Sequence, residues 1–127
     1  MRIDHIGMYV EDLEAMKEFY TTYFSAQANG GYHNGKTGLS TYFLCFEDGA
    51  RLEIMRRPQM HQQQKRLMQT GYIHLAISVG SRENVIEITE RLQAAGYEVV
   101  SHPRTTGDGY FESSVLDPEG NQIEITI

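Results

Sequence analysis

The stretch that decides the fold is GYIHLAISV, residues 71–79, which alternates apolar side chains with small or polar ones. Such alternation predicts a strand with one buried face. The stretch carries His74, and an imidazole is an unusual choice for a strand that only fills a core. A second stretch, RIDHIGMYV at residues 2–10, has the same alternation and contains His5. Two similar strands, each with a histidine, indicate an internal repeat.

Each histidine strand is followed by a short turn and an amphipathic helix. Apolar residues recur at helical spacing, as Leu13, Met16, Phe19, Tyr20, Tyr23 and Phe24 in the first half and Val85, Ile88 and Leu92 in the second. Asp12 and Ser81 are the predicted N-caps of these helices. Gly96 is predicted to end the second helix. The two halves therefore share a strand–turn–helix beginning.

The two halves also end alike, with FEDGARLEIMR in the first and LDPEGNQIEITI in the second. Both contain a turn with glycine and then a strand that carries a glutamate, Glu53 or Glu124. The DPEG tetrapeptide predicts a type I turn. Two modules of βαβββ type therefore account for most of the chain.

We predict an α+β fold in one domain, residues 1–127, built from module 1 (1–57) and module 2 (72–127). The polar segment 58–71 reads as the connector, with a short helix around residues 62–68. NGGYHNGKTG, residues 29–38, is predicted to be a glycine-rich loop or hairpin.

Strand periodicity places four candidate metal ligands on corresponding faces: His5, Glu53, His74 and Glu124. In each of the four strands the apolar residues occupy the opposite face. Two imidazoles and two carboxylates suit a divalent first-row ion, which would also offset the cost of burying the carboxylates. Taken singly, such a histidine is more often a hydrogen-bonding residue and such a glutamate part of a solvated face. The matching register in both halves favours the metal site.

The composition excludes several classes of function. The chain has 127 residues, enough for one domain with a hydrophobic core. Its formal net charge of −6 disfavours a basic nucleic-acid-binding face, and no apolar run approaches the ~20 residues that span a bilayer. The first residues lack a signal-peptide layout, and Cys45 is the only cysteine. We expect a cytoplasmic protein that acts on a small molecule, with no nucleic-acid or membrane partner.

These motifs resemble those of the vicinal oxygen chelate superfamily, which includes glyoxalase I, bleomycin resistance proteins and dioxygenases. DHIGMYVEDLEAMKEFY resembles the family's opening, HLAISV the start of its second module, and LDPEGNQIEI its closing signature. The resemblance implies two paired βαβββ modules that form a curved, half-open sheet around a metal. It also implies a homodimer, and it leaves open whether the modules pair within one chain or between two.

The ligand quartet resembles that of glyoxalase I-like members, which present His or Gln, Glu, His and Glu. Dioxygenases and fosfomycin-modifying thiol transferases typically lack the equivalent of Glu53, and epimerase-like members usually carry Gln there. Bleomycin-sequestering relatives have lost the ligands. The resemblance implies one divalent ion per site, Ni, Zn, Co, Mn or Fe.

The implied reaction is that of a metal-dependent lyase. It isomerises the hemithioacetal of methylglyoxal, or of a similar small 2-oxoaldehyde, and a thiol to a lactoyl thioester. The resemblance implies Glu124 as the catalytic base and Glu53 as a ligand or second proton carrier. A thiol transferase, a dioxygenase, an epimerase and a non-catalytic small-molecule-sequestering resistance protein remain alternatives.

The chain departs from the glutathione-binding pattern of this family. Glutathione-using members usually have Arg four residues after the first ligand and Asn four residues after the first Glu, where this chain has Tyr9 and Arg57. Strand parity places both on the ligand face, and we predict that Tyr9, Met55 and Arg57 bind substrate. Arg57 can bind a carboxylate or phosphate bidentately. We therefore expect a thiol other than glutathione, or a different small carbonyl compound.

Overall fold

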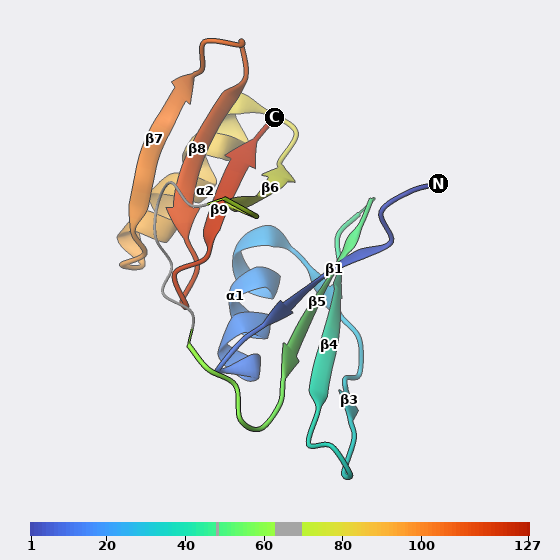
Figure 1. Cartoon of the computed structure of the whole chain (residues 1–127). Helices are drawn as coiled ribbons and strands as arrows, with labels where there is room; N and C mark the ends of the chain where they lie inside the picture. Colours follow the sequence, from blue (N-terminus) through green and yellow to red (C-terminus); the bar gives the residue numbers. More distant parts are fainter. Residues whose placement is uncertain (48, 63–69) are drawn as a thin grey trace. The chain divides into compact units, whose positions relative to one another are not determined.

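The computed structural model describes residues 1–47, 49–62 and 70–127. The chain forms two compact units, unit 1 (Met1–Gln63) and unit 2 (Gln64–Ile127) (Figure 1). Each unit has its own sheet and one long helix. The α+β fold class predicted from the sequence is confirmed.

Unit 1 packs one helix on a five-stranded sheet. Its elements are β1 (His5–Tyr9), α1 (Leu13–Phe24), β2 (Gln27–Ala28), β3 (Tyr32–His33), β4 (Ser40–Cys45) and β5 (Arg51–Arg56). The strand order is β1-β5-β4-β2, and β3 also pairs with β4. β1 and β5 run parallel and the other pairs antiparallel.

Unit 2 repeats this plan in fewer strands. Its elements are β6 (His74–Ser78), α2 (Arg82–Ala94), β7 (Val99–Thr105), β8 (Phe111–Leu116) and β9 (Gln122–Thr126). The strand order is β6-β9-β8-β7, with β6 and β9 parallel. Unit 2 is therefore a βαβββ module, as predicted. Unit 1 differs because two strands of two residues each, β2 and β3, follow its helix, where unit 2 has the single strand β7.

Local signals define the ends of both helices. The Asp12 carboxylate accepts a hydrogen bond from the Ala15 amide at 3.0 Å, and Ser81 caps α2 in the same way. Gly96 follows α2 with a φ of +91°, which a glycine adopts without strain. The segment 29–38 is a hairpin, because β3 pairs with β4 across it. The helix predicted around residues 62–68 falls almost wholly on residues 63–69, outside the described part of the chain.

The core of unit 1 lies between α1 and the sheet. Met16, Phe19, Tyr20 and Phe24 are the buried residues of α1, and Leu52 and Ile54 of β5 are buried beneath them. In unit 2, Val85 and Leu92 of α2 and Ile123 and Ile125 of β9 are buried. Neither described helix is long and apolar enough to cross a membrane.

Two apolar residues of the predicted packed faces are more exposed than expected. Ile6 of β1 is 41% exposed, and Ile73, which precedes β6, is 47% exposed. β1 and β6 are edge strands of their sheets, so each has a partner strand on one side only within the described residues. The edge position explains why these apolar side chains remain accessible.

A buried hydroxyl pair ties α2 to β8. Thr89 donates to the Val85 carbonyl at 2.5 Å, and its oxygen lies 2.7 Å from the Ser113 hydroxyl. Because the Thr89 proton is already used, Ser113 is the donor of the second bond. Both side chains are almost completely buried.

We expect the Thr89→Val variant to lose about 1–3 kcal/mol of unfolding free energy, because the Ser113 hydroxyl keeps no acceptor in the core. Urea unfolding followed by circular dichroism measures this loss. Thr21→Val is the matched control, since Thr21 also donates to a backbone carbonyl on its helix, but near the surface. Equal unfolding midpoints for the two variants would contradict a stabilising role for the pair.

Candidate metal centre

Unit 1 holds the first predicted ligand pair on the parallel β1–β5 ladder. The register pairs Gly7 with Glu53. Gly7 lies two residues after His5, so both residues are on the same face of β1. The His5 Nε2 atom lies 3.6 Å from the Glu53 Oε2 atom. A Cβ atom on Gly7 would lie 4.0 Å from that same oxygen and 3.0 Å from the Met55 methyl carbon. A glycine there keeps the space beside the pair open.

Unit 2 repeats the arrangement on the parallel β6–β9 ladder. The register pairs Ala76 with Glu124, as Gly7 is paired with Glu53 in unit 1. The His74 Nε2 atom lies 3.5 Å from the Glu124 Oε2 atom. Each unit therefore presents one imidazole nitrogen and one carboxylate oxygen in the same register.

The spacing within each pair fits two ligands of one metal ion. Ligand atoms about 2.0–2.2 Å from an ion, at octahedral or tetrahedral angles, lie roughly 2.8–3.6 Å apart. The two observed separations, 3.6 and 3.5 Å, lie at the upper end of this range. Among the described residues no group of three or more His, Cys, Asp or Glu side chains is arranged to hold a metal ion, so each unit by itself offers only a pair of candidate ligands.

The His5 ring is held by a carboxylate that the sequence analysis did not select. The His5 Nδ1 atom lies 2.9 Å from the Asp4 Oδ2 atom. Arg51 donates a hydrogen bond to the same oxygen at 2.5 Å. Phe43 packs against the ring edge-on, with centroids 5.4 Å apart. The hydrogen bonds from His5 and Arg51 hold the pKa of Asp4 below its ordinary value. A charged Asp4 favours the proton on Nδ1, which leaves Nε2 free to bind a cation.

We expect the Asp4→Asn variant to bind Zn²⁺ or Ni²⁺ about tenfold to a hundredfold more weakly, because the carboxylate that orients His5 is lost. Competition with a chromophoric chelator measures the affinity. Asp108→Asn removes the same charge from an exposed turn of unit 2 and is the control. A similar loss of metal affinity in both variants would mean that net charge causes the effect. It would contradict the role of Asp4 in orienting the His5 ring.

Glu53 is also fixed by a neighbour. The buried Thr41 hydroxyl donates to the Glu53 Oε1 atom at 3.2 Å, while Oε2 is the atom near His5. Thr41 lies on β4 opposite Met55. Thr41 was not predicted from the sequence, because its contact with Glu53 depends on the antiparallel register between β4 and β5.

The surroundings of the second pair are more acidic. On β8, Ser114 pairs with Glu124 of β9. Glu112 lies two residues before Ser114, so Glu112 and Glu124 are on the same face of the sheet. Burial raises the pKa of the Glu112 carboxyl above its ordinary value, and the Glu124 carboxylate raises it further. Negative charge therefore collects around Glu124, where a cation would be favoured. The residue before His74 is Ile73, so unit 2 has no counterpart of Asp4 at that position.

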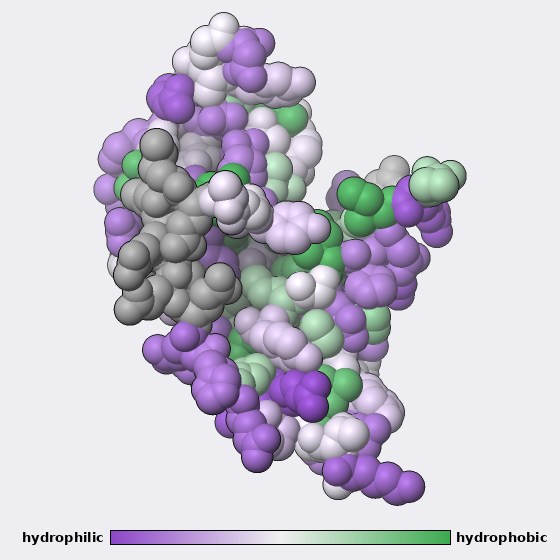
Figure 2. Space-filling model, in the orientation of Figure 1, coloured by the Kyte–Doolittle hydropathy of each residue, from purple (hydrophilic) through white to green (hydrophobic). Residues whose placement is uncertain are grey.

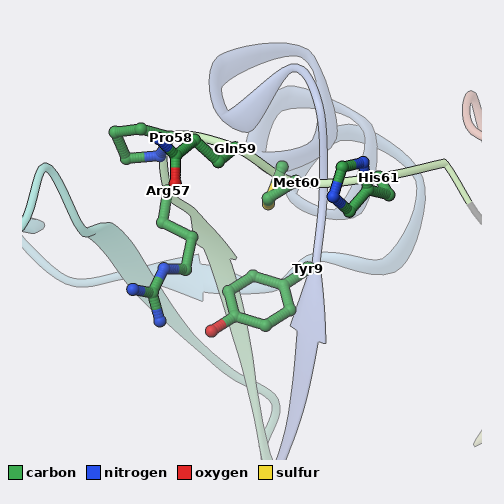
Figure 3. Close-up of a pocket in the computed structure, with 6 residues that line it drawn as sticks. All are labelled: Tyr9, Arg57, Pro58, Gln59, Met60 and His61. Atoms are coloured by element: carbon green, nitrogen blue, oxygen red, sulfur yellow. The ribbon is translucent and has the colours of Figure 1, made fainter.

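A hollow of about 470 Å³ lies beyond the end of the β1–β5 ladder (Figure 3). Its lining residues are Tyr9, Arg57, Pro58, Gln59, Met60 and His61. Two of the three predicted substrate-binding residues, Tyr9 and Arg57, thus line one hollow. The third, Met55, is not in the lining, and its methyl group lies against Gly7 instead.

A repeated α+β unit with a His–Glu pair in the same register defines a class of proteins built from two glyoxalase-like modules. The chain belongs to the Glyoxalase/Bleomycin resistance protein/Dioxygenase superfamily, whose family model matches residues 2–125. This family membership agrees with the resemblance seen in the sequence motifs.

Individual proteins are similar to this chain at low sequence identity. Protein YqjT of Bacillus subtilis, described as uncharacterized, is 29% identical over 128 residues, which cover 95% of this chain and 94% of that protein. A glyoxylase/bleomycin resistance protein/dioxygenase domain from Frankia sp. EAN1pec superposes with a TM-score of 0.83 at 18% identity, covering 100% of this chain and 97% of that chain. Glyoxalase I from Zea mays gives a TM-score of 0.79 at 21% identity, covering 98% of this chain and 44% of the maize chain. These structural likenesses establish the fold.

Proposed function

We propose that the chain is a cytoplasmic glyoxalase I-like metalloenzyme, a lyase that isomerises the hemithioacetal of a small 2-oxoaldehyde and a thiol to a 2-hydroxy thioester. The observation that carries the proposal is the repeated His–Glu pair, with nitrogen–oxygen separations of 3.6 and 3.5 Å. Both pairs contain a glutamate. The family's dioxygenases and thiol transferases typically lack the glutamate that corresponds to Glu53.

His5, Glu53, His74 and Glu124 would together hold one divalent ion, with the pairs supplied by two modules of one chain or of two. When bound, such an ion supplies Lewis-acid polarisation of the two adjacent substrate oxygens. The surrounding residues serve to orient the ligands. Asp4 fixes the His5 ring, and Thr41 fixes the Glu53 carboxylate.

Glu124 is the proposed catalytic base. It removes the proton from the carbon that carries sulfur and returns it to the neighbouring carbon, while the hydroxyl proton passes from the first oxygen to the second, so that the product is an isomer of the substrate. The difference between the two glutamates supports this choice. Glu53 accepts a hydrogen bond from Thr41, whereas no described side chain donates a hydrogen bond to Glu124. A carboxylate without such a tether is the better candidate to move between ligand and base.

We propose that the working protein is a homodimer. Accessible apolar groups lie on edge strand β1, at Ile6 (41% exposed), and directly before edge strand β6, at Tyr72 (105%) and Ile73 (47%). Apolar side chains along free strand edges favour association with a second copy. Light scattering coupled to gel filtration is expected to give the mass of two chains, and a monomer at assay concentration would contradict this part of the proposal.

The direct test of function is a thioester-formation assay. Metal-loaded protein is supplied with methylglyoxal and each of several thiols, and thioester absorbance is followed. Metal-dependent thioester formation supports the proposal. Oxygen consumption with Fe²⁺ or Mn²⁺ would instead indicate a dioxygenase, and ligand binding that survives metal removal, with no turnover, would indicate a sequestering protein.

A further inference from the structure

The β3–β4 hairpin forms one wall of a second pocket in unit 1, which we call the hairpin pocket. Its volume is about 370 Å³, and residues 13–14, 30–33 and 40–42 line it. Figure 2 shows mostly hydrophilic groups around the tip of this hairpin, at the lower right. The proposed metal ligands of unit 1 are not in the lining, so the chemistry of the hairpin pocket is considered by itself.

The hairpin pocket lies on the helix side of the unit 1 sheet. Tyr42 points to this side, because its hydroxyl donates a hydrogen bond to the Glu14 carboxylate of α1 at 2.7 Å. Ser40 lies two residues before Tyr42 on β4 and therefore shares this side. Thr41 lies between them and points to the other side, where its hydroxyl donates to Glu53. The hairpin pocket and Glu53 are thus on opposite faces of the sheet.

A serine and a histidine are hydrogen-bonded in the hairpin pocket. The His33 Nδ1 atom lies 2.8 Å from the Ser40 Oγ atom. The antiparallel register pairs the two residues, which keeps their side chains on one face. The turn that joins their strands is fixed, because the Asn34 side-chain oxygen accepts hydrogen bonds from the Lys36 and Thr37 amides. A hydroxyl within hydrogen-bond reach of an imidazole is the arrangement that activates a serine as a nucleophile.

A cationic residue continues the same row across the sheet. Ser40 pairs with Arg56 on β5, so His33, Ser40 and Arg56 are neighbours on three adjacent strands. Directly opposed residues of an antiparallel pair share a face and have Cβ atoms about 4.5–5.5 Å apart. Arg56 is exposed at the end of its strand. A guanidinium beside a nucleophile stabilises the negative charge that develops on an attacked carbonyl oxygen.

Several contacts fix the wall formed by residues 29–31. Gly31 has a φ of +76° and packs so closely on the Tyr42 ring that a Cβ atom there would be 2.7 Å from a ring carbon. The Asn29 side-chain oxygen accepts hydrogen bonds from the Gly31 and Phe43 amides and ties the segment to β4. The Lys17 ammonium lies over the Tyr42 ring, 4.4 Å from its centroid. A wall held in this way can orient a substrate beside the serine without further ordering.

We propose that the hairpin pocket is a second reactive site, at which Ser40 hydrolyses small, activated carboxylic esters. The His33 Nδ1 atom takes the hydroxyl proton as the Ser40 Oγ atom bonds to the carbonyl carbon. The carbonyl oxygen becomes negative beside Arg56. When this adduct collapses, the bond from carbon to the alcohol oxygen breaks, and the imidazolium gives its proton to the leaving oxygen. The alcohol departs and an acyl group remains on Ser40.

Water completes the proposed reaction. It attacks the acyl carbon while the His33 Nδ1 atom takes a water proton, and that proton passes to the Ser40 oxygen when the acyl bond breaks. The products are one carboxylic acid and one alcohol. The only permanently charged lining residue, Glu14, forms an ion pair with Lys17, so an uncharged ester is the expected substrate. This activity is independent of the metal centre and of the proposed lyase reaction.

The first experiment labels the full-length protein with phenylmethylsulfonyl fluoride, which reacts stably with activated serines, and locates the label by mass spectrometry of peptides. We expect the label on Ser40, and labelling about a hundredfold slower in His33→Gln, within the range that a general base contributes. His102→Gln is the matched control, because His102 is an exposed histidine of unit 2. The absence of label on Ser40, or equal rates in the two histidine variants, would overturn the proposal.

The second experiment follows hydrolysis of p-nitrophenyl acetate with and without a metal chelator. We expect the rate to be unaffected by the chelator and to fall about a hundredfold in Ser40→Ala, whose fold is verified by circular dichroism. Activity that the chelator removes and Ser40→Ala retains would overturn the proposal by assigning the hydrolysis to the metal centre.

A charge variant tests the cation in the row. We expect Arg56→Gln to lower the hydrolysis rate about tenfold, less than the loss of a buried oxyanion donor, because Arg56 is exposed. Lys36→Gln is the matched control, since it removes the same charge from an exposed residue of the hairpin. An equal fall in both variants would overturn the role of Arg56.

Discussion

The Glu124→Gln variant is expected to lower kcat/KM for hemithioacetal isomerisation by about a thousandfold, within the range that a general base contributes. The amide keeps the size of the side chain and can still offer an oxygen to a metal. It cannot accept a proton at neutral pH, so the transfer between the two carbons is lost. Steady-state kinetics on metal-loaded protein measure the effect, and circular dichroism verifies that the fold is retained.

Two control variants show whether a lower kcat/KM in Glu124→Gln reflects the loss of the base. Glu112→Gln removes a carboxylate from the same sheet face and is expected to lower kcat/KM less than tenfold. Glu53→Gln changes the glutamate that accepts a hydrogen bond from Thr41, and we expect it to lower kcat/KM less than Glu124→Gln does. Equal losses at Glu53 and Glu124, or full activity in Glu124→Gln, would contradict the assignment of the base.

The second large effect concerns metal affinity. We expect His5→Ala and His74→Ala each to weaken binding of Zn²⁺ or Ni²⁺ by about a hundredfold or more. This figure follows because a binding free energy of about 10–16 kcal/mol shared by four ligands gives about 3 kcal/mol for each. The two losses should be similar, since both histidines bind the same ion in this account.

The control for both histidine variants is His102→Ala. His102 lies on β7, is exposed, and has no role in the proposed site. Competition titrations against a chelator measure the three affinities under one set of conditions. If only one of His5→Ala and His74→Ala binds the metal more weakly, the two His–Glu pairs do not share an ion.

Much of the fold was predictable because its signals are local. The period-two pattern identified the alternation of buried Leu52 and Ile54 with half-buried Glu53, and the same pattern holds in β9. The caps at Asp12 and Ser81 also depend only on residues within one turn. The two-residue strands β2 and β3 were not predicted, because segments so short carry no periodicity.

The supporting residues of the site were not predictable, because their contacts depend on register between distant segments. Thr41 reaches Glu53 across an antiparallel pair, and Arg51 reaches Asp4 across a parallel one. Asp4 had a signal, since a carboxylate directly before a candidate metal-binding histidine is a common means of orienting the ring. The role of Gln59 in the hollow depends on backbone conformation, which sequence patterning in a polar connector does not reveal.

The most direct test of the central claim is a calorimetric titration of tag-free, chelator-stripped protein with Ni²⁺, Zn²⁺ and Mn²⁺. If the two His–Glu pairs form one centre, tight binding will saturate at about one ion per chain, and His5→Ala and His74→Ala will each abolish this tight phase. Saturation at about two ions per chain would mean that each pair binds independently. The absence of binding by all three ions would contradict the metal centre itself.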